Sequence, residues 1–235
     1  MTSASGTSTK TESLPRPRQV VCADAFEWMR THPAEVGSSV VTSLPDASEL
    51  PKLSFDAWRL WFVDAARTVI RWVPPDSVAI FFQTDIRRSG AWIDKGHLVM
   101  GAADQENALV VWHKIVCRAP PGTVSPGRPS YSHMICISRS PRAFPKRPGP
   151  DVLIDTGASS WTRAMGIEAC RVACAYLRDE TDTRLIVDPF CGRGGLLAVA
   201  ESMGFASIGV DISARRCRAA RSHSIAEPSG GGGAR

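Results

Sequence analysis

A glycine-containing turn between two aspartates has the residue types of a site for a small ligand. The turn reads Pro189-Phe190-Cys191-Gly192-Arg193-Gly194-Gly195 and comes directly after Asp188. Glycine lets the backbone approach a ligand closely, and the N–H groups at the start of a following helix can bind a carboxylate or a phosphate. Asp211 comes later, where the next strand is expected to end, and a carboxylate there suits a ribose diol. The pattern is typical of a pocket for a nucleoside cofactor.

The segments around this turn predict the order strand, loop, helix, strand. Leu185–Val187 is an apolar run short enough for a buried strand, and Ser207–Val210 is a second one. Residues 196–203 predict a helix that ends before Gly204. The dinucleotide fingerprint G-x-G-x-x-G fails, because Leu197 stands where its third glycine belongs. The alternative is an ordinary turn whose glycines only tighten the loop.

A second polar group, Ser43-Leu44-Pro45-Asp46, follows a short apolar strand predicted around Val40 and Val41. The Ser43 hydroxyl and the Leu44 carbonyl could accept hydrogen bonds from an amino group, which would stabilise positive charge that develops on its nitrogen. Pro45 would fix the loop, and Asp46 could serve as a second acceptor or as a general base. The alternative is a strand-to-loop turn capped by Ser43.

A third carboxylate, Asp24, lies between a predicted strand at Gln19–Cys22 and a helix predicted over Ala25–Thr31. A longer helix is expected from an N-cap at Ser54 to about Val73, with apolar residues at helical spacing. Its tryptophans, Trp58, Trp61 and Trp72, are interpreted as core positions rather than as a stacking platform.

The remaining segments predict the outer part of a sheet and two more helices. Strands are expected at Ser77–Gln83, Leu109–Val116 and Tyr131–Ser138, the last two as an antiparallel edge pair. Helices are expected over Trp161–Leu177 and from Ile212 to about Ser224. Residues 85–107 and 118–130 are predicted to be loops, and residues 139–150 to be a linker or mobile loop.

Length and composition favour one α/β domain. The chain has 235 residues, of which 43% are hydrophobic and 22% charged. We expect a disordered leader at 1–18, one domain at 19–226 and a flexible tail at 227–235. No apolar run has the length of a membrane span, and the polar start lacks a signal peptide. Seven cysteines without a C-x-x-C pair indicate a cytoplasmic protein without metal or disulfides.

The turn after Asp188 resembles motif I of class I S-adenosylmethionine-dependent methyltransferases, and DPFCG is close to the form found in amino-methyltransferases of nucleic acids. The resemblance implies S-adenosylmethionine as cofactor. It further implies that Asp211 binds the ribose, and that Asp24 and the Ala25 N–H bind the adenine. The implied cofactor site is completed by Asp188, Pro189, Phe190, Cys191, Gly192, Gly194 and Ile212.

The order of motifs along the chain is rotated, because the cofactor turn comes late. If the strand before Asp24 lies beside the one that ends at Asp211, and the strand before Ser43 beside the one that ends at Asp188, the order becomes 3-2-1-4-5. Over residues 19–223 this arrangement is similar to circularly permuted β-class DNA amino-methyltransferases. It implies a doubly wound, mostly parallel sheet with an antiparallel edge hairpin, and catalysis by the Ser43–Asp46 segment.

Two departures from that family bear on the substrate. Leu44 replaces the first proline of its S-P-P-Y motif, and Asp46 replaces the aromatic that stacks on the target base. No segment is long enough for a separate DNA-reading region, so RNA, which can be recognised by its folded shape, is favoured over DNA. An accessory subunit could also supply recognition. The alternatives are a methyltransferase for protein or a small molecule, and a non-catalytic subunit with this fold.

Charge and histidines add weaker expectations. The net charge of +5 and the pI of about 9.0 fit an anionic partner without identifying it. The arginines of the last helix form either its solvated face or, with Arg139, Arg142 and Arg147, a stripe for a phosphate backbone. His113 and His133 are interpreted as buried or hydrogen-bonded structural residues.

Overall fold

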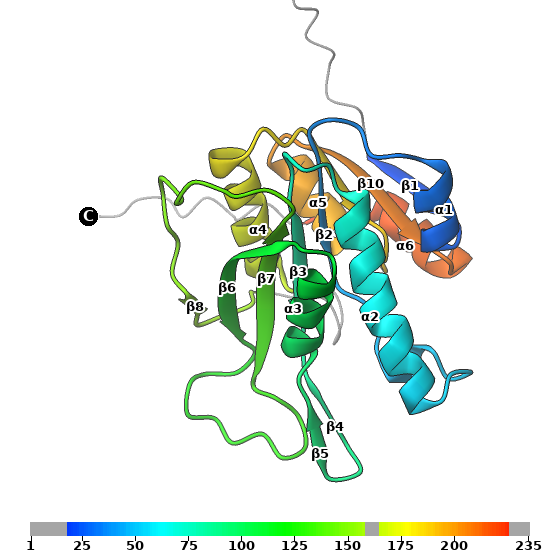
Figure 1. The fold of residues 1–235 in the computed structure, drawn as a ribbon, viewed down its shortest axis with the longest axis vertical. Coiled ribbons are helices and arrows are strands. Elements are labelled where there is room, and N and C mark those ends of the chain that lie inside the picture. Colours follow the sequence, from blue (N-terminus) through cyan, green and yellow to red (C-terminus); the bar gives the residue numbers. More distant parts are fainter. Residues whose placement is uncertain (1–17, 158–164, 226–235) are drawn as a thin grey trace, which may run out of the picture.

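The computed structural model describes residues 18–157 and 165–225, which form a layered α/β structure around one large sheet (Figure 1). The strands of this sheet are β1 (Gln19–Cys22), β2 (Ser38–Thr42), β3 (Ala79–Gln83), β6 (Leu109–Cys117), β7 (Tyr131–Ser138), β8 (Val152–Leu153), β9 (Leu185–Asp188) and β10 (Ala206–Asp211). Their order across the sheet is β1-β10-β9-β2-β3-β7-β6-β8. A separate hairpin consists of β4 (Ile86–Arg88) and β5 (Ala91–Ile93).

The predicted order 3-2-1-4-5 is confirmed by the strands β1, β10, β9, β2 and β3, which are all parallel. The late strand β9 is central, because Val187 pairs with Ile208 on one side and with Val40 on the other. The carboxyl ends of strands from the beginning and the end of the chain therefore lie at one edge of the sheet. Ligands of open α/β sheets bind at this edge.

Helices cover both faces of the sheet. They are α1 (Ala25–Thr31), α2 (Phe55–Trp72), α3 (Lys95–Gln105), α4 (Ile167–Glu180), α5 (Gly195–Ser202) and α6 (Ala214–Ser222), with a 3-10 turn η1 (Ala47–Glu49). Figure 1 shows α2 and α3 on one side of the sheet, and α4 and α5 on the other. Neighbouring strand residues alternate between these layers: Val40 packs in the core under α2, whereas Val41 packs under α4. Burial on both faces explains why β3 and β9 are nearly continuous apolar runs.

The long amphipathic helix agrees with its prediction. The Ser54 hydroxyl accepts a hydrogen bond from the Ala57 N–H at 3.2 Å, and α2 begins at the next residue after Ser54. Trp58 and Phe62 are fully buried, as expected for core positions. Among the described residues, no helix combines the length and apolar character that a membrane span requires.

The prediction that residues 85–107 are a loop is wrong, because this segment holds β4, β5 and α3. Ser89 and Gly90 both have positive φ, which is the geometry of a two-residue hairpin turn. The Asp94 side chain accepts a hydrogen bond from the His97 N–H at 2.8 Å and so caps α3. The hairpin and α3 were not predicted, because polar residues at the turn and at the cap interrupt the apolar periodicity.

Two boundaries differ from their predictions. The antiparallel pair β6 and β7 is present, but β8 pairs in parallel with β6 and forms the edge of the sheet. In the predicted helix over 161–177, residues 161–164 lie outside the described residues, and α4 begins only at Ile167, after Gly166 with φ of +87°.

The predicted tail at 227–235, and all of the predicted leader except Arg18, also lie outside the described residues. Arg18 donates a hydrogen bond to the Ala220 carbonyl at 3.0 Å and is part of the folded domain.

Of the two alternatives for the arginines, the single basic stripe does not fit the fold. Arg139 and Arg142 follow β7, whose last residues pair with the start of β3, at the edge opposite the carboxyl ends of the parallel strands. The N–H of Arg147 donates to Glu180 at the end of α4. Helix α6 contacts β1 and β10, which β9, β2 and β3 separate from β7. The two groups of arginines therefore belong to different parts of the molecule.

Candidate active site

A pocket of about 250 Å³ lies at the carboxyl ends of β1, β10, β9 and β2. We call it the first pocket. The predicted site residues that line it are Asp24, Ala25, Ser43, Pro45, Asp188, Pro189, Phe190, Cys191, Gly192, Asp211 and Ile212. The early and late segments thus meet around one cavity. The roles of these residues in binding a cofactor stay predictions.

Asp211 fixes the backbone on two sides of the first pocket. One carboxylate oxygen accepts a hydrogen bond from the Gly192 N–H at 3.1 Å, and the other accepts one from the Ser213 N–H at 2.7 Å. The residue is 6% exposed, so these bonds lie largely out of water. Asp24 has a comparable local role, because its Oδ1 accepts from the N–H groups of Phe26 and Glu27 and caps α1.

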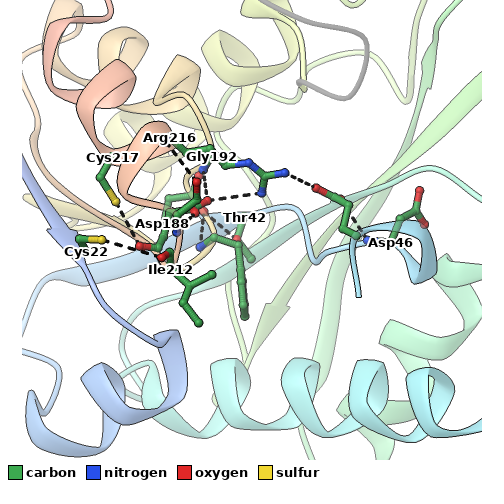
Figure 2. A network of polar contacts seen from close by, with 12 residues as sticks. Cys22, Thr42, Asp46, Asp188, Gly192, Ile212, Arg216 and Cys217 are labelled. Atoms are coloured by element: carbon green, nitrogen blue, oxygen red, sulfur yellow. Dashed lines mark hydrogen bonds and ion pairs between the residues drawn. The ribbon is translucent and has the colours of Figure 1, made fainter. Parts of the chain in front are cut away.

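Asp188 joins the cofactor turn to the neighbouring strand (Figure 2). Its Oδ1 accepts a hydrogen bond from the Thr42 hydroxyl at 2.7 Å and one from the Phe190 N–H at 3.1 Å. The pKa of Asp188 is raised to about 7, mainly by burial and to a smaller extent by the charge of Asp211, while the two hydrogen bonds oppose the rise. Thr42, which the sequence did not single out, therefore couples the end of β2 to the end of β9.

Asp188→Asn is expected to stabilise the ligand-free protein at high pH and to leave it nearly unchanged at low pH. The folded pKa of about 7 exceeds the ordinary value of 3.8, so the folded state holds a proton that the unfolded chain has released. Stability is then lost as the pH rises between roughly 4 and 7, by at most about 4 kcal/mol. Asparagine cannot ionise and avoids this loss. Urea unfolding of both proteins at about pH 4.5 and about pH 8 measures it; an equal difference at both pH values would contradict the shift.

Three aromatic rings form one wall of the first pocket. The ring centroids of Phe26 and Phe190 are 6.0 Å apart, those of Trp61 and Phe190 6.1 Å, and those of Phe26 and Trp61 5.9 Å, all edge to face. Such pairs hold each other in place and present flat apolar surface to a ligand. Trp61, which was predicted to be a core residue, lines the pocket together with Phe26.

Arg216 connects α6 to the segment after Ser43 (Figure 2). Its guanidinium lies 3.0 Å from a carboxylate oxygen of Glu49 and 3.7 Å from one of Asp211. Six further residues line the first pocket that were not among the predicted site residues or core aromatics, and these are Glu49, Leu50, Met165, Arg193, Gly195 and Arg216. A basic residue on a helix looks the same in sequence whether it faces water or a carboxylate from a distant segment.

Gly194 does not line the first pocket, in contrast to the implied role at the cofactor. It adopts the left-handed conformation with φ of +79°, and a Cβ built there would lie 2.9 Å from both Cα and Cβ of Ala220. The glycine therefore lets α5 begin close against α6. Gly194 therefore contributes to the packing of α5 against α6, which holds the turn after Asp188 in place.

Gly194→Ala is expected to lower the free energy of unfolding by about 2–4 kcal/mol, from left-handed strain and overpacking together. Gly204→Ala is the matched control, since Gly204 has φ of +83° but an added methyl group there would meet no atom within 4 Å. The control should cost only the strain, about 1–2 kcal/mol. Urea denaturation measures both, and equal losses would show that contact with Ala220 does not matter.

The Ser43–Asp46 segment is held by two side chains from other elements. The indole N–H of Trp58 donates to the Pro45 carbonyl at 3.2 Å. The ammonium of Lys95, whose side chain is 3% exposed, lies 2.8 Å from Oδ1 of Asp46. Leu44 is 2% exposed and packs into the core. Asp46 thus forms an ion pair with a buried lysine at the place where the related motif has an aromatic.

Leu44 and Asp46 line a second pocket, of about 270 Å³, instead of the first. Ser43 and Glu49 line both pockets. The rest of the second pocket is formed by Ser48, Phe82, Thr84, Asp85, Ile86, Arg87, Lys95, Arg118, Gly127, Arg128 and Pro129. The strand end at Ser43 therefore stands between two cavities.

The structural interpretation of the two histidines is supported by their hydrogen bonds. His133 is 6% exposed, and its ring nitrogens lie 3.1 Å from a carboxylate oxygen of Asp85 and 2.9 Å from His113 Nε2. Asp85 also accepts hydrogen bonds from the Trp92 indole and the Lys95 N–H. Asp85, Asp94 and His133 have potential metal-ligand atoms within 4.8 Å of one another. Asp85 and His133 are already engaged by these hydrogen bonds, which fix the wall of the second pocket.

Comparisons with known proteins find solved structures of similar fold. No protein-family model matches the chain, and no curated protein matches its sequence. PvuII DNA methyltransferase, which is cytosine-N4-specific, has a TM-score of 0.67 at 16% identity, over 88% of this chain and 86% of that one. A protein assigned as a DNA modification methylase of Thermus thermophilus, complexed with S-adenosylmethionine, has a TM-score of 0.65 at 16% identity, over 87% and 92%.

A third solved structure, the M1.HpyAVI–SAM complex, has a TM-score of 0.58 at 10% identity and covers 87% of this chain and 98% of that one. At these identities the likeness concerns the fold. The chain has the class I methyltransferase fold that was predicted from its motifs.

Proposed function

We propose that this protein is a methyltransferase that uses S-adenosylmethionine to methylate an exocyclic amino group of a nucleic-acid base. One observation carries the proposal: Ser43 lines both pockets, so a methyl donor in the first and an acceptor in the second would meet beside it. The names of the structural neighbours, two of which include DNA methylation and two a complex with this cofactor, support the same activity. The rotated motif order supports a circularly permuted member of this fold.

The residues of the first pocket suit this cofactor. Asp211 would accept hydrogen bonds from the ribose hydroxyls, and Asp24 with the Ala25 N–H would bind the adenine. The partly buried rings of Phe26, Trp61 and Phe190 offer apolar contact. Asp188 and Gly192 would line the methionine portion. The bound cofactor supplies a methyl group already activated by its sulfonium, so the protein mainly has to align a nucleophile and exclude water.

The second pocket would position the amino group. Its nitrogen is a poor nucleophile because the lone pair is delocalised into the ring of the base. Hydrogen bonds from its N–H groups to the Ser43 hydroxyl and the Leu44 carbonyl would localise that pair and stabilise the positive charge that develops. Pro45, held by Trp58, would keep the carbonyl in place. Asp46 offers the second pocket a further acceptor, oriented by Lys95.

Two observations bear on the type of nucleic acid. The names of the neighbours favour DNA. The ion pair of Asp46, in place of an aromatic, and the absence of a long reading segment among the described residues favour RNA or an accessory recognition subunit. We therefore propose a nucleic-acid substrate, and the test includes both DNA and RNA.

Incubation with tritiated-methyl S-adenosylmethionine and separate total DNA, RNA and protein tests the proposal. We expect label in DNA or RNA and, after nuclease digestion, in a base methylated on its amino nitrogen. Label in protein alone would favour the alternative protein methyltransferase. Cofactor binding by calorimetry without any transfer would favour a non-catalytic subunit. If the protein did not bind S-adenosylmethionine at all, the proposal would be overturned.

A further inference from the structure

The second pocket is lined by arginines from two separate segments. Arg87 comes from β4, and Arg118 and Arg128 come from the two ends of the connection between β6 and β7. The base of this connection is held in place, because the Arg118 N–H donates to the Ser130 carbonyl at 2.7 Å. Arg118 and Arg128 thus lie on a tethered loop that lines the pocket next to Ser43.

Arg118 and Arg128 lie close enough to influence each other. Burial lowers the pKa of the Arg118 guanidinium, and the positive charge of Arg128 lowers it further. Both side chains are exposed to solvent, and like charges on neighbouring side chains still repel each other there. An anion between them would offset that repulsion, and a planar guanidinium can bind a phosphate through two hydrogen bonds.

The carboxylates of the same pocket are engaged with other groups. Asp46 is paired with Lys95 at 2.8 Å, and Glu49 with Arg216 at 3.0 Å. Asp85 accepts hydrogen bonds from His133, from the Trp92 indole and from the Lys95 backbone. An incoming anion would therefore meet acids that already have partners.

We propose that Arg118 and Arg128 bind the phosphate of the nucleotide whose base is methylated, while its amino group lies at Ser43. This inference rests on the proposed function and deepens it, because it names an anchor for the substrate that is independent of base stacking. Arg87, exposed on the hairpin, is placed to contact the neighbouring phosphate. The occupant is a single unpaired nucleotide, because a pocket of about 270 Å³ is too small for a stacked base pair with its backbone.

Binding of nucleoside monophosphates to the full chain tests the inference. Cytidine and adenosine monophosphates are titrated by calorimetry, with the matching nucleosides and inorganic phosphate in parallel, in the presence of S-adenosylhomocysteine. We expect each monophosphate to bind at least about 10-fold more tightly than its nucleoside. Single-stranded DNA and RNA oligonucleotides of one sequence then show whether a polymer or a free nucleotide is the better ligand.

Variants locate the phosphate. Arg128→Gln, on the exposed loop, and Arg118→Lys, which keeps the charge but not the paired hydrogen bonds, should each weaken monophosphate binding by about 10-fold. Nucleoside binding should stay unchanged. Arg139→Gln, at the opposite edge of the sheet, is the matched control. For oligonucleotides, Arg128→Gln should also reduce the slope of log affinity against log salt by about 1.

Equal affinity for nucleosides and monophosphates would overturn the inference, as would an Arg139→Gln loss as large as that of Arg128→Gln. The results distinguish a failure of this inference from a failure of the proposed function. Arginine-dependent monophosphate binding without methyl transfer would support the site and contradict the activity. Methyl transfer to nucleic acid that is insensitive to both arginine variants would do the reverse.

Discussion

Asp211→Ala should weaken S-adenosylmethionine binding by at least about 100-fold. Each hydrogen bond to a charged group contributes about 1.5–3 kcal/mol, and this carboxylate would lose two to the ribose hydroxyls. The same carboxylate accepts the N–H groups of Gly192 and Ser213 at 3.1 and 2.7 Å. Its removal therefore loosens the cofactor turn as well as the direct contact.

Calorimetry with the purified variants measures this effect. Asp76→Ala is the matched control, since Asp76 is an exposed acid in the turn after α2, away from the first pocket. Thermal unfolding reports whether Asp211→Ala is still folded, and Asp211→Asn, which keeps a carbonyl acceptor, should retain intermediate affinity. If Asp211→Ala bound the cofactor within about twofold of the unaltered protein, Asp211 would not be a cofactor ligand.

Ser43→Ala should lower the rate of methyl transfer by about 100-fold and leave cofactor affinity nearly unchanged. The loss of one well-placed group that stabilises developing charge typically costs a factor of about 10² to 10³, or about 3–4 kcal/mol. Ser43 follows β2 at the junction of both pockets, so its hydroxyl is positioned for this role. Binding to Asp211 and the aromatic wall does not depend on it.

Single-turnover transfer to whichever polymer accepts label, with calorimetry for the cofactor, separates the two effects. Ser48→Ala provides the control, because Ser48 lines the second pocket but not the first. Ser43→Thr, which restores a hydroxyl, should recover part of the rate. Full activity of Ser43→Ala would move the chemistry to another group and leave only the cofactor part of the proposal.

The central strands and the acids that follow them could be predicted because their signals are local. Asp24, Asp188 and Asp211 each come at or just after the end of a short apolar strand, and the rule that parallel strands bring their carboxyl ends to one edge places them together. The rotated strand order was predicted from the same rule together with the resemblance to class I methyltransferases. No property of a distant residue was needed.

Contacts between distant segments could not be predicted in this way. Thr42 bonds to Asp188, Lys95 to Asp46 and Arg216 to Glu49 across 146, 49 and 167 residues. From the sequence alone, each of these residues could equally be an ordinary strand, helix or surface residue without a distant partner. The helix α3 was missed because it follows a polar hairpin. The strand β8 was missed because a strand of two residues is too short to show an alternating apolar pattern.

The position of β9 has a consequence for how the protein is made. Its neighbours β2 and β10 pair with it from opposite sides, and β2 is synthesised long before it. While the ribosome adds the residues from β3 to α4, one side of β2 has no strand to pair with. Pairing across such sequence separations is slow, and exposed strand edges favour aggregation of the nascent chain. Chaperone dependence during synthesis is therefore expected to be greater than for a chain that begins with its central strand.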